Sequence, residues 1–273
     1  LEAGVELRLH TSVAETRVRS GGIAQVVTES KSGRQAEQAA IYLDCTGDAD
    51  LAFRAGAPCR EGRSRDGLTQ PMTLNFRMAN VDLSRMPPRE ELNRRFAQAK
   101  AEGRLVCPRE DVLWFRTTHS DVVHFSTTRV VGLSGVSAAD LTAAEVEARR
   151  QMRSLAEFLV KEIPGFSRAY LQQSASQIGI RETRRIVGDY VLTGRDVLSA
   201  RKFRDGIARC NYPIDIHSPT GAGTDIRSVP EGDYYEIPYR CLLPKGIDNL
   251  LVAGRCISAT HEGQSSLRVI PQC

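Results

Sequence analysis

The sequence predicts a mixed α/β fold into which a second, β-rich region is inserted. In residues 41–58 a short apolar strand runs through a polar turn directly into a helix. A second apolar strand, at 250–253, likewise ends on a glycine, Gly254. Between them, residues 112–131 are rich in Val, Phe, Trp and Thr, which favour strands. At 273 residues, 41% of them hydrophobic, the chain can bury one large core or two modest ones.

The turn Thr46-Gly47-Asp48 is the first candidate for function. A strand that enters a helix through such a turn places backbone N–H groups and the helix N-terminus at its carboxyl end, where α/β folds bind anions and nucleotides. Gly47 allows a ligand to approach the backbone closely. An alternative interpretation is a capped helix, with Thr46 or Asp48 as the N-cap and Gly56 at the C-terminal end.

Before this turn, the sequence predicts a three-stranded β-meander. Strand-forming runs occupy 5–10, 13–18 and 23–29, and Gly21-Gly22 is a good hairpin turn between two of them. A second turn at Ser32-Gly33 leads to the strand at 41–43.

The remaining elements are predicted from periodicity and from turn residues. We expect a long loop after Pro58 and a turn at residues 119–121. Helices are expected at 89–102, 139–162 and 196–200, and strands at 72–78, 172–178, 213–216 and 235–239, with two or three more in 112–131.

Charge and cysteine content exclude several classes of protein. The 37 basic and 33 acidic residues are interspersed and give a net charge of only +4, which disfavours nucleic-acid binding. No apolar run is long enough to span a membrane. The seven cysteines form no CxxC pair, which indicates a reducing, cytoplasmic location with no disulfide framework and no metal site. Cys45 and Cys256 are interpreted as small buried residues.

Four motifs in order resemble one family closely. They are DCTGDADLAFRAGAP (44–58), QPMTLNFRM (70–78), GIRETRRIVGDYVLT (179–193) and NLLVAGRCISATHEGQSSLRVIP (249–271). Together they resemble the FAD-dependent oxidoreductases whose flavin domain has the glutathione-reductase type of fold. The resemblance implies a partial FAD/NAD(P)-binding, Rossmann-like domain from 1–58 and 249–273, with a substrate-binding or cap domain at 59–248.

Members of that family begin with a Gly-x-Gly-x-x-Gly turn that holds the FAD pyrophosphate, and this motif does not occur in the 273 residues. We therefore expect the chain to be an internal fragment of a longer flavoprotein. On its own it would bind FAD weakly or not at all and would be inactive.

The resemblance also implies which residues contact the flavin and which face the substrate. The implied cofactor-binding residues are Thr46, Gly47, Asp48, Gly254, Arg255, Arg268 and Ile270. In related proteins an Asp often follows the second glycine, and here Arg255 stands in its place.

Three residues are predicted to take part in catalysis. His261 would donate or accept a substrate proton near the flavin, or alternatively would cap its loop together with Glu262. Arg181 would clamp a substrate carboxylate or hydroxyl array, or alternatively would form a structural pair with its neighbour Glu182. Arg268 would stabilise the reduced, anionic flavin, or alternatively would satisfy turn carbonyls. His119 and His124 have no metal-ligand spacing and are interpreted as structural.

The predicted function is therefore hydride transfer between a small-molecule substrate and FAD, with the substrate held between the two domains. The alternative is an accessory or binding module that kept the fold but lost the cofactor. No arrangement of Ser, His and Asp and no pair of carboxylates supports a hydrolase or lyase. A homo-oligomer is left open, and neither nucleic acid nor a membrane span is expected.

Overall fold

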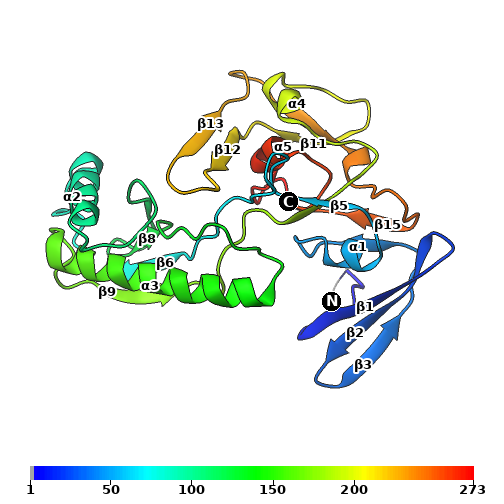
Figure 1. Cartoon of the computed structure of the whole chain (residues 1–273), viewed down its shortest axis with the longest axis horizontal. Helices are drawn as coiled ribbons and strands as arrows, with labels where there is room; N and C mark the ends of the chain where they lie inside the picture. Colours follow the sequence, from blue (N-terminus) through cyan, green and yellow to red (C-terminus); the bar gives the residue numbers. More distant parts are fainter. Residues whose placement is uncertain (1–2) are drawn as a thin grey trace. The chain divides into compact units, whose positions relative to one another are not determined.

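A computed structural model describes residues 3–273 and divides the chain into two compact units. Unit 1 comprises Leu1–Gly67, Arg184–Asp215 and Ile226–Cys273, and unit 2 comprises Leu68–Thr183 and Ile216–Asp225. Both units combine helices and small sheets, so the fold is mixed α/β as predicted (Figure 1). Whether the units correspond to a flavin-binding and a substrate-binding domain stays a prediction.

Unit 1 begins with an antiparallel sheet of three strands in the order β1-β2-β3. The strands are β1 (Thr11–Arg19), β2 (Gly22–Ser30) and β3 (Gly33–Glu37). The meander was predicted, but its composition was partly wrong, because residues 5–10 form no strand and the third strand begins at Gly33. Gly21 and Gly33 have φ angles of 83° and 95°, which glycine adopts without strain and which the two tight turns require.

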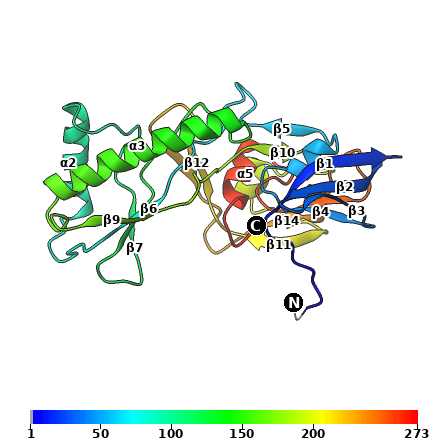
Figure 2. The ribbon, with the colours of Figure 1, turned by 90° about the horizontal axis from the view of Figure 1, so that it is seen from below.

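The centre of unit 1 is a parallel pair formed by β4 (Tyr42–Asp44) and β15 (Leu250–Val252). Tyr42 pairs with Leu250 and Asp44 with Val252, so segments about 200 residues apart in the sequence lie side by side (Figure 2). The two apolar strands that the sequence predicts, at 41–43 and at 250–253, therefore belong to one sheet. Because the strands are parallel, the turns that follow them lie at the same edge.

Short elements complete unit 1. They are α1 (Asp50–Arg54), β5 (Cys59–Glu61), β10 (Arg184–Ile186), α4 (Gly194–Leu198), β11 (Gly206–Cys210), β14 (Tyr235–Pro238), the 3₁₀ turn η1 (Tyr239–Cys241) and α5 (His261–Leu267). Strand β5 pairs with β10 and β11 pairs with β14, both antiparallel. Two further strands, β12 (Ile214–His217) and β13 (Thr224–Arg227), form a two-stranded sheet, of which residues 216–225 belong to unit 2. The sequence predicted a loop where β5 lies and missed α5, β11 and β13.

Unit 2 is a four-stranded antiparallel sheet packed against helices. Its strand order is β7-β8-β6-β9, and α3 runs along one face (Figures 1 and 2). The elements are β6 (Phe76–Ala79), α2 (Arg89–Ala101), β7 (Trp114–Arg116), β8 (Val123–Phe125), α3 (Ala138–Glu162) and β9 (Tyr170–Ser174). Helices α2 and α3 lie within one residue of their predicted bounds. Ser137 caps α3 by accepting a hydrogen bond from the Asp140 N–H.

The core of unit 2 is aromatic. Phe76 and Phe125 stack with their ring centroids 5.0 Å apart, and Phe166 contacts Phe125 at 6.1 Å. These rings are fully buried with Leu74, Met78 and the inner side of α3. The alternation along β6 and β8 sends every second side chain into this core and leaves the others on the outer face of the sheet.

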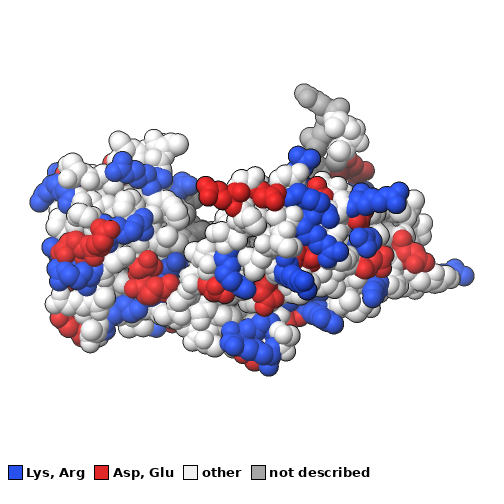
Figure 3. All heavy atoms as spheres, turned by 90° about the horizontal axis from the view of Figure 1, so that it is seen from above, with Lys and Arg blue, Asp and Glu red and all other residues white. Residues whose placement is uncertain are grey.

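No helix within residues 3–273 combines the length and the apolar character that crossing a membrane requires. On the face drawn in Figure 3, basic and acidic side chains are interspersed, as the sequence predicted.

Candidate functional site

The predicted cofactor-binding turns lie next to each other in unit 1. The guanidinium of Arg255, after β15, donates a hydrogen bond to Asp48, after β4, with Nη2 and Oδ1 2.7 Å apart. Both side chains are largely buried. The ion pair therefore connects the Thr46-Gly47-Asp48 turn with the Gly254-Arg255 turn at the shared edge of the parallel pair.

The first turn is held in shape by a carboxylate that the sequence analysis did not single out. Asp44 is only 1% exposed. Its Oδ1 accepts hydrogen bonds from the N–H of Thr46 at 2.9 Å and from the Thr46 hydroxyl at 2.7 Å, and its Oδ2 accepts one from the N–H of Ala52 at 2.9 Å. An Asp two residues before a Thr, at the end of a strand, is a turn signal that could have identified it.

Two glycines allow this edge to form. Gly47 has a φ of 80°, and a Cβ there would lie 2.5 Å from Nη1 of Arg255. Only glycine therefore lets the guanidinium lie over the turn. Gly254 has a φ of 92°, and no atom lies within 4 Å of the position that its Cβ would take, so the backbone is open there.

Arg255 also keeps a polar atom available. Its Nε is buried and has no hydrogen-bond partner among residues 3–273. A buried N–H without an acceptor costs about 1–3 kcal/mol, so this group is ready to donate to an acceptor atom of a ligand. Next to it, Cys256 is buried, and burial, followed by the negative charge of Asp44, raises the pKa of its thiol to about 12. Cys45, by contrast, is exposed, so the prediction that both cysteines are buried was wrong for Cys45.

His261 lies in a pocket of unit 1 with a volume of about 440 Å³. It is the first residue of α5 and is 5% exposed, so it is part of a helix and not of the loop that the sequence suggested. The pocket is lined by Arg60, Glu61, Gly62, Arg63, Ser64, Gly67, Arg185, Val191, Ala259, Thr260, His261 and Glu262.

The start of α5 is positioned by close backbone packing. Thr260 is its N-cap, with its hydroxyl accepting from the N–H of Gly263, and the Thr260 N–H donates to the carbonyl of Leu192 at 2.8 Å. A Cβ on Gly263 would lie 2.4 Å from that same carbonyl oxygen. Glycine at 263 therefore allows the helix to begin this close to residue 192, which fixes His261 in the pocket wall.

Charged groups line the same pocket as His261. The buried guanidinium of Arg185 donates to the carbonyls of Ala259, at 3.0 Å, and Gly62, at 2.8 Å. Burial acts to raise the pKa of Glu262, but backbone and Thr260 hydrogen bonds and nearby positive charge outweigh it and lower that pKa. The carboxylate is therefore ionised at neutral pH. The pocket can hold a polar small molecule and exchange a proton with it through the imidazole.

The other predicted residues are placed as follows. Arg268 ends α5 and donates to the carbonyl of Asp215 at 3.2 Å, with the Asp215 carboxylate 3.6 Å away. Ile270 is 91% exposed. Arg181 belongs to unit 2, where its guanidinium donates to the carbonyl of Pro71 at 2.6 Å and to the hydroxyl of Thr73.

The structure thus brings together Thr46, Gly47, Asp48, Gly254 and Arg255. The sequence did not predict that Arg63 and Arg185 share a pocket with His261, because segments near residues 62, 185 and 260 converge only in the folded chain.

Comparison with solved structures gives weak similarity to flavin-dependent halogenases. The chain is similar to the flavin-dependent brominase Bmp2, with 12% identity, a TM-score of 0.36, and coverage of 70% of this chain and 46% of that one. A triple mutant of Bmp2 gives 13% identity, a TM-score of 0.37, and coverage of 69% and 43%. For MibH, a tryptophan 5-halogenase, the identity is 15%, the TM-score 0.30, and the coverage 66% and 28%. The chain thus spans less than half the length of each of these proteins.

No curated protein matches the sequence. All 273 residues match the family described as FAD dependent oxidoreductase, and this match does not depend on the weak structural similarities. The chain therefore belongs to the FAD-dependent oxidoreductase family, and its cofactor is FAD.

Proposed function

We propose that this protein transfers a hydride between a small-molecule substrate and FAD, and that the edge formed by the two glycine turns of unit 1 contacts the cofactor. The observation that carries the proposal is the Arg255–Asp48 ion pair, which joins both turns at the carboxyl ends of two parallel strands. Ligands of open α/β sheets bind at this edge. The open backbone at Gly254 and the unpartnered Nε of Arg255 fit a polar, electron-rich group such as FAD carries.

The residues of this chain would bind and orient the reactants, and FAD, when bound, would supply the redox chemistry by exchanging a hydride at its N5 atom. The positive charge of Arg255 would favour an anionic group nearby, and Arg268 is proposed to do the same. His261 would hold or release the substrate proton. We propose Thr46, Gly47, Asp48 and Ile270 as further cofactor contacts and Arg181 as a substrate contact.

The test is to measure FAD in the full-length protein and in Arg255→Gln. The wild type should carry flavin, visible in its absorption spectrum, and should be bleached by its reducing substrate under anaerobic conditions. Arg255→Gln should lose about tenfold or more in FAD affinity, since a hydrogen bond to a charged group contributes about 1.5–3 kcal/mol.

Arg54→Gln is the matched control. It removes a guanidinium from α1 that forms only an exposed pair with Asp50, so FAD affinity should not change. A wild-type protein that stays colourless after addition of FAD would contradict the proposal and favour an accessory module. Equal FAD affinity in Arg255→Gln and wild type would exclude only the contact between Arg255 and FAD and would leave the proposed reaction in place.

A further inference from the structure

The outer face of the sheet in unit 2 carries a row of polar and aromatic side chains. Strand pairing places Arg77 on β6 directly opposite His124 on β8 and Gln173 on β9, and places His124 opposite Phe115 on β7. Residues directly opposite each other in antiparallel strands share a face. The row therefore crosses all four strands on the side away from the aromatic core.

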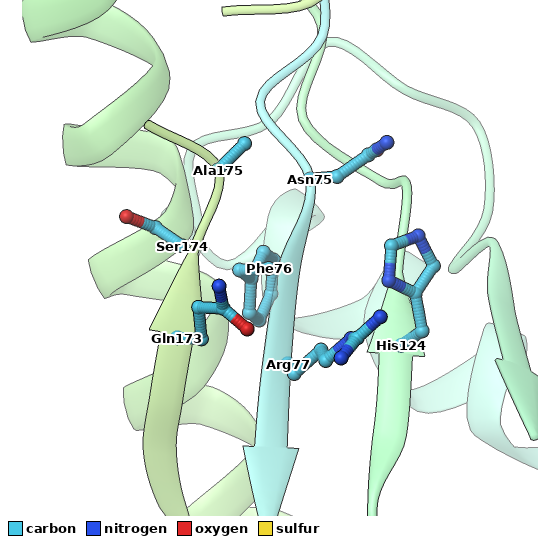
Figure 4. A pocket seen from close by; sticks show the side chains of 7 residues that line it. All are labelled: Asn75, Phe76, Arg77, His124, Gln173, Ser174 and Ala175. Carbon is cyan, nitrogen blue, oxygen red and sulfur yellow. The ribbon is translucent and has the colours of Figure 1, made fainter. Parts of the chain in front are cut away.

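A pocket of about 170 Å³ lies along this row (Figure 4). It is lined by Asn75, Phe76, Arg77, His124, Gln173, Ser174 and Ala175. In Figure 4 the side chains of Asn75 and Arg77 extend from the same strand region to the side on which the imidazole of His124 lies. A wider hollow beside it shares Arg77 and His124 and adds the half-exposed ring of Phe115.

The polar groups of the pocket lack protein partners. Within residues 3–273, Arg77 and His124 form no side-chain hydrogen bond or ion pair, and the side-chain amide of Asn75 has no hydrogen-bond partner either. Most arginines of unit 2 are engaged, as Arg129 shows: it is 1% exposed and hydrogen-bonds Glu110 and the carbonyl of Gly221. The guanidinium of Arg77 is exposed and solvated by water, so no protein acceptor has to be displaced when an anion enters the pocket.

Charge identifies the kind of ligand. No acidic residue lines the pocket or the adjoining hollow. Burial, followed by the charge of Arg77, lowers the pKa of His124, so its imidazole is neutral at pH 7. The pocket then carries one permanent positive charge, on the planar guanidinium of Arg77, which matches the geometry of a carboxylate, while a second arginine, Arg116, lines only the adjoining hollow. A singly charged carboxylate complements it better than a doubly charged phosphate.

We propose that this pocket binds the carboxylate of a small organic acid, with the guanidinium of Arg77 forming an ion pair with it and the amide N–H of Asn75 and a ring N–H of His124 donating hydrogen bonds to it. The exposed ring of Phe115 would contact the apolar part of the molecule. Small organic acids are then the substrate class of the proposed oxidoreductase. Binding of the acid does not depend on the proposed function, and only calling the acid a substrate rests on it. Arg181, whose guanidinium binds Pro71 and Thr73, does not line this pocket.

The experiment measures binding of benzoate, benzamide and inorganic phosphate to the full-length protein by titration calorimetry, with and without FAD. Benzoate should bind saturably, and benzamide, which has the same shape without the charge, should bind at least about tenfold more weakly. Arg77→Gln should lose at least about tenfold in benzoate affinity, and Arg77→Lys should recover part of it.

Arg153→Gln is the matched control, because Arg153 lies on α3 of the same unit and forms only an exposed pair with Glu157. It should bind benzoate like the wild type. Circular dichroism checks that each variant is folded, and Asn75→Ala provides a second variant that should weaken binding. Tighter binding of phosphate than of benzoate, or unchanged benzoate affinity in folded Arg77→Gln, would overturn the proposal. Because benzoate binding is measured both with and without FAD, failure of this pocket to bind benzoate can be distinguished from failure of the protein to bind FAD.

Discussion

At the scale of single residues, the edge formed by the two glycine turns of unit 1 depends on one glycine, Gly47. Gly47 combines a left-handed backbone with the close approach of Arg255, whose guanidinium occupies the space that a side chain at 47 would need. Asp44 holds this turn and the start of α1 together through three hydrogen bonds. Backbone conformation and guanidinium position are therefore specified together at this turn.

Gly47→Ala should separate these two requirements. The new Cβ would displace the guanidinium and break the Arg255–Asp48 ion pair, so FAD affinity should fall by about tenfold or more. The left-handed backbone adds about 1–2 kcal/mol of strain, which lowers stability in urea unfolding.

Gly56→Ala is the control for Gly47→Ala. Gly56 has nearly the same φ, 82° against 80°, but no atom lies within 4 Å of its Cβ position. It should lose similar stability and keep its FAD. Equal loss of FAD in both variants would mean that strain, and not Arg255, determines cofactor binding.

At the scale of elements, short helices in unit 1 are stabilised by specific caps. Helix α4 carries a capping box in which Thr193 and Asp196 satisfy each other's backbone N–H groups. Asp196 is buried, and it also accepts hydrogen bonds from Tyr190 and Arg201 at 2.9 Å. Helix α4 packs against α5, so this box supports the helix that carries His261.

The pH dependence of stability should reflect Asp196. Burial acts to raise its pKa, but the hydrogen bonds from Thr193, Arg201 and Tyr190 outweigh it and leave the pKa below its ordinary value. A folded-state pKa below the unfolded one contributes stability above about pH 4, and this is lost as the pH falls through the folded pKa. Asp196→Asn should therefore cost about 1–3 kcal/mol at pH 7, and the difference should shrink below pH 4.

Urea unfolding between pH 2.5 and 7 measures this. Asp233→Asn is the control, because Asp233 lies at the surface, where its carboxylate pairs with exposed Lys202 and accepts the N–H of its neighbour Tyr234, so its effect should be small at every pH. A constant difference between wild type and Asp196→Asn across the range would show that charge on Asp196 is not what stabilises α4.

Elements with a strong local pattern were predictable from the sequence. Helices α2 and α3 follow from apolar spacing and end signals, and β4 and β15 follow from apolar runs before glycine turns. Helix α5 was not, because HEGQSSL has no apolar periodicity and its position depends on the contact with Leu192. The short strands β5, β11 and β13 were missed for a similar reason, since their pairing partners are distant or follow irregular turns.

The candidate site was predictable to the same degree. The two glycine turns were found because each is a local strand–turn pattern, whereas their connection by Arg255 and Asp48 is a tertiary contact. The outer row of the unit 2 sheet was not found, since it depends on the register of four strands. His124 was interpreted as structural on its spacing alone.

At the scale of the whole molecule, each unit has a core of its own. In unit 2 the core is built around the stacked rings of Phe76 and Phe125. In unit 1, buried residues such as Ile23, Leu51 and Val252 come from both ends of the chain. Compact units with separate cores can unfold as separate cooperative units, so a single two-state transition is not expected.

Phe125→Ala should destabilise unit 2 selectively. Removing a fully buried ring from a packed core costs about 3–5 kcal/mol, and all of its ring contacts lie within unit 2. Hydrogen exchange of the full-length protein should accelerate in peptides from residues 68–183 and stay unchanged in those from 184–215. Val146→Ala, which truncates a largely exposed side chain on α3, should leave exchange in both units as in the wild type.

Because the edge formed by the two glycine turns lies in unit 1, Phe125→Ala should also keep its FAD while losing benzoate binding. Equal acceleration of exchange in both sets of peptides would instead mean that the units fold as one cooperative body, and loss of FAD would place part of the cofactor site under the control of the unit 2 core.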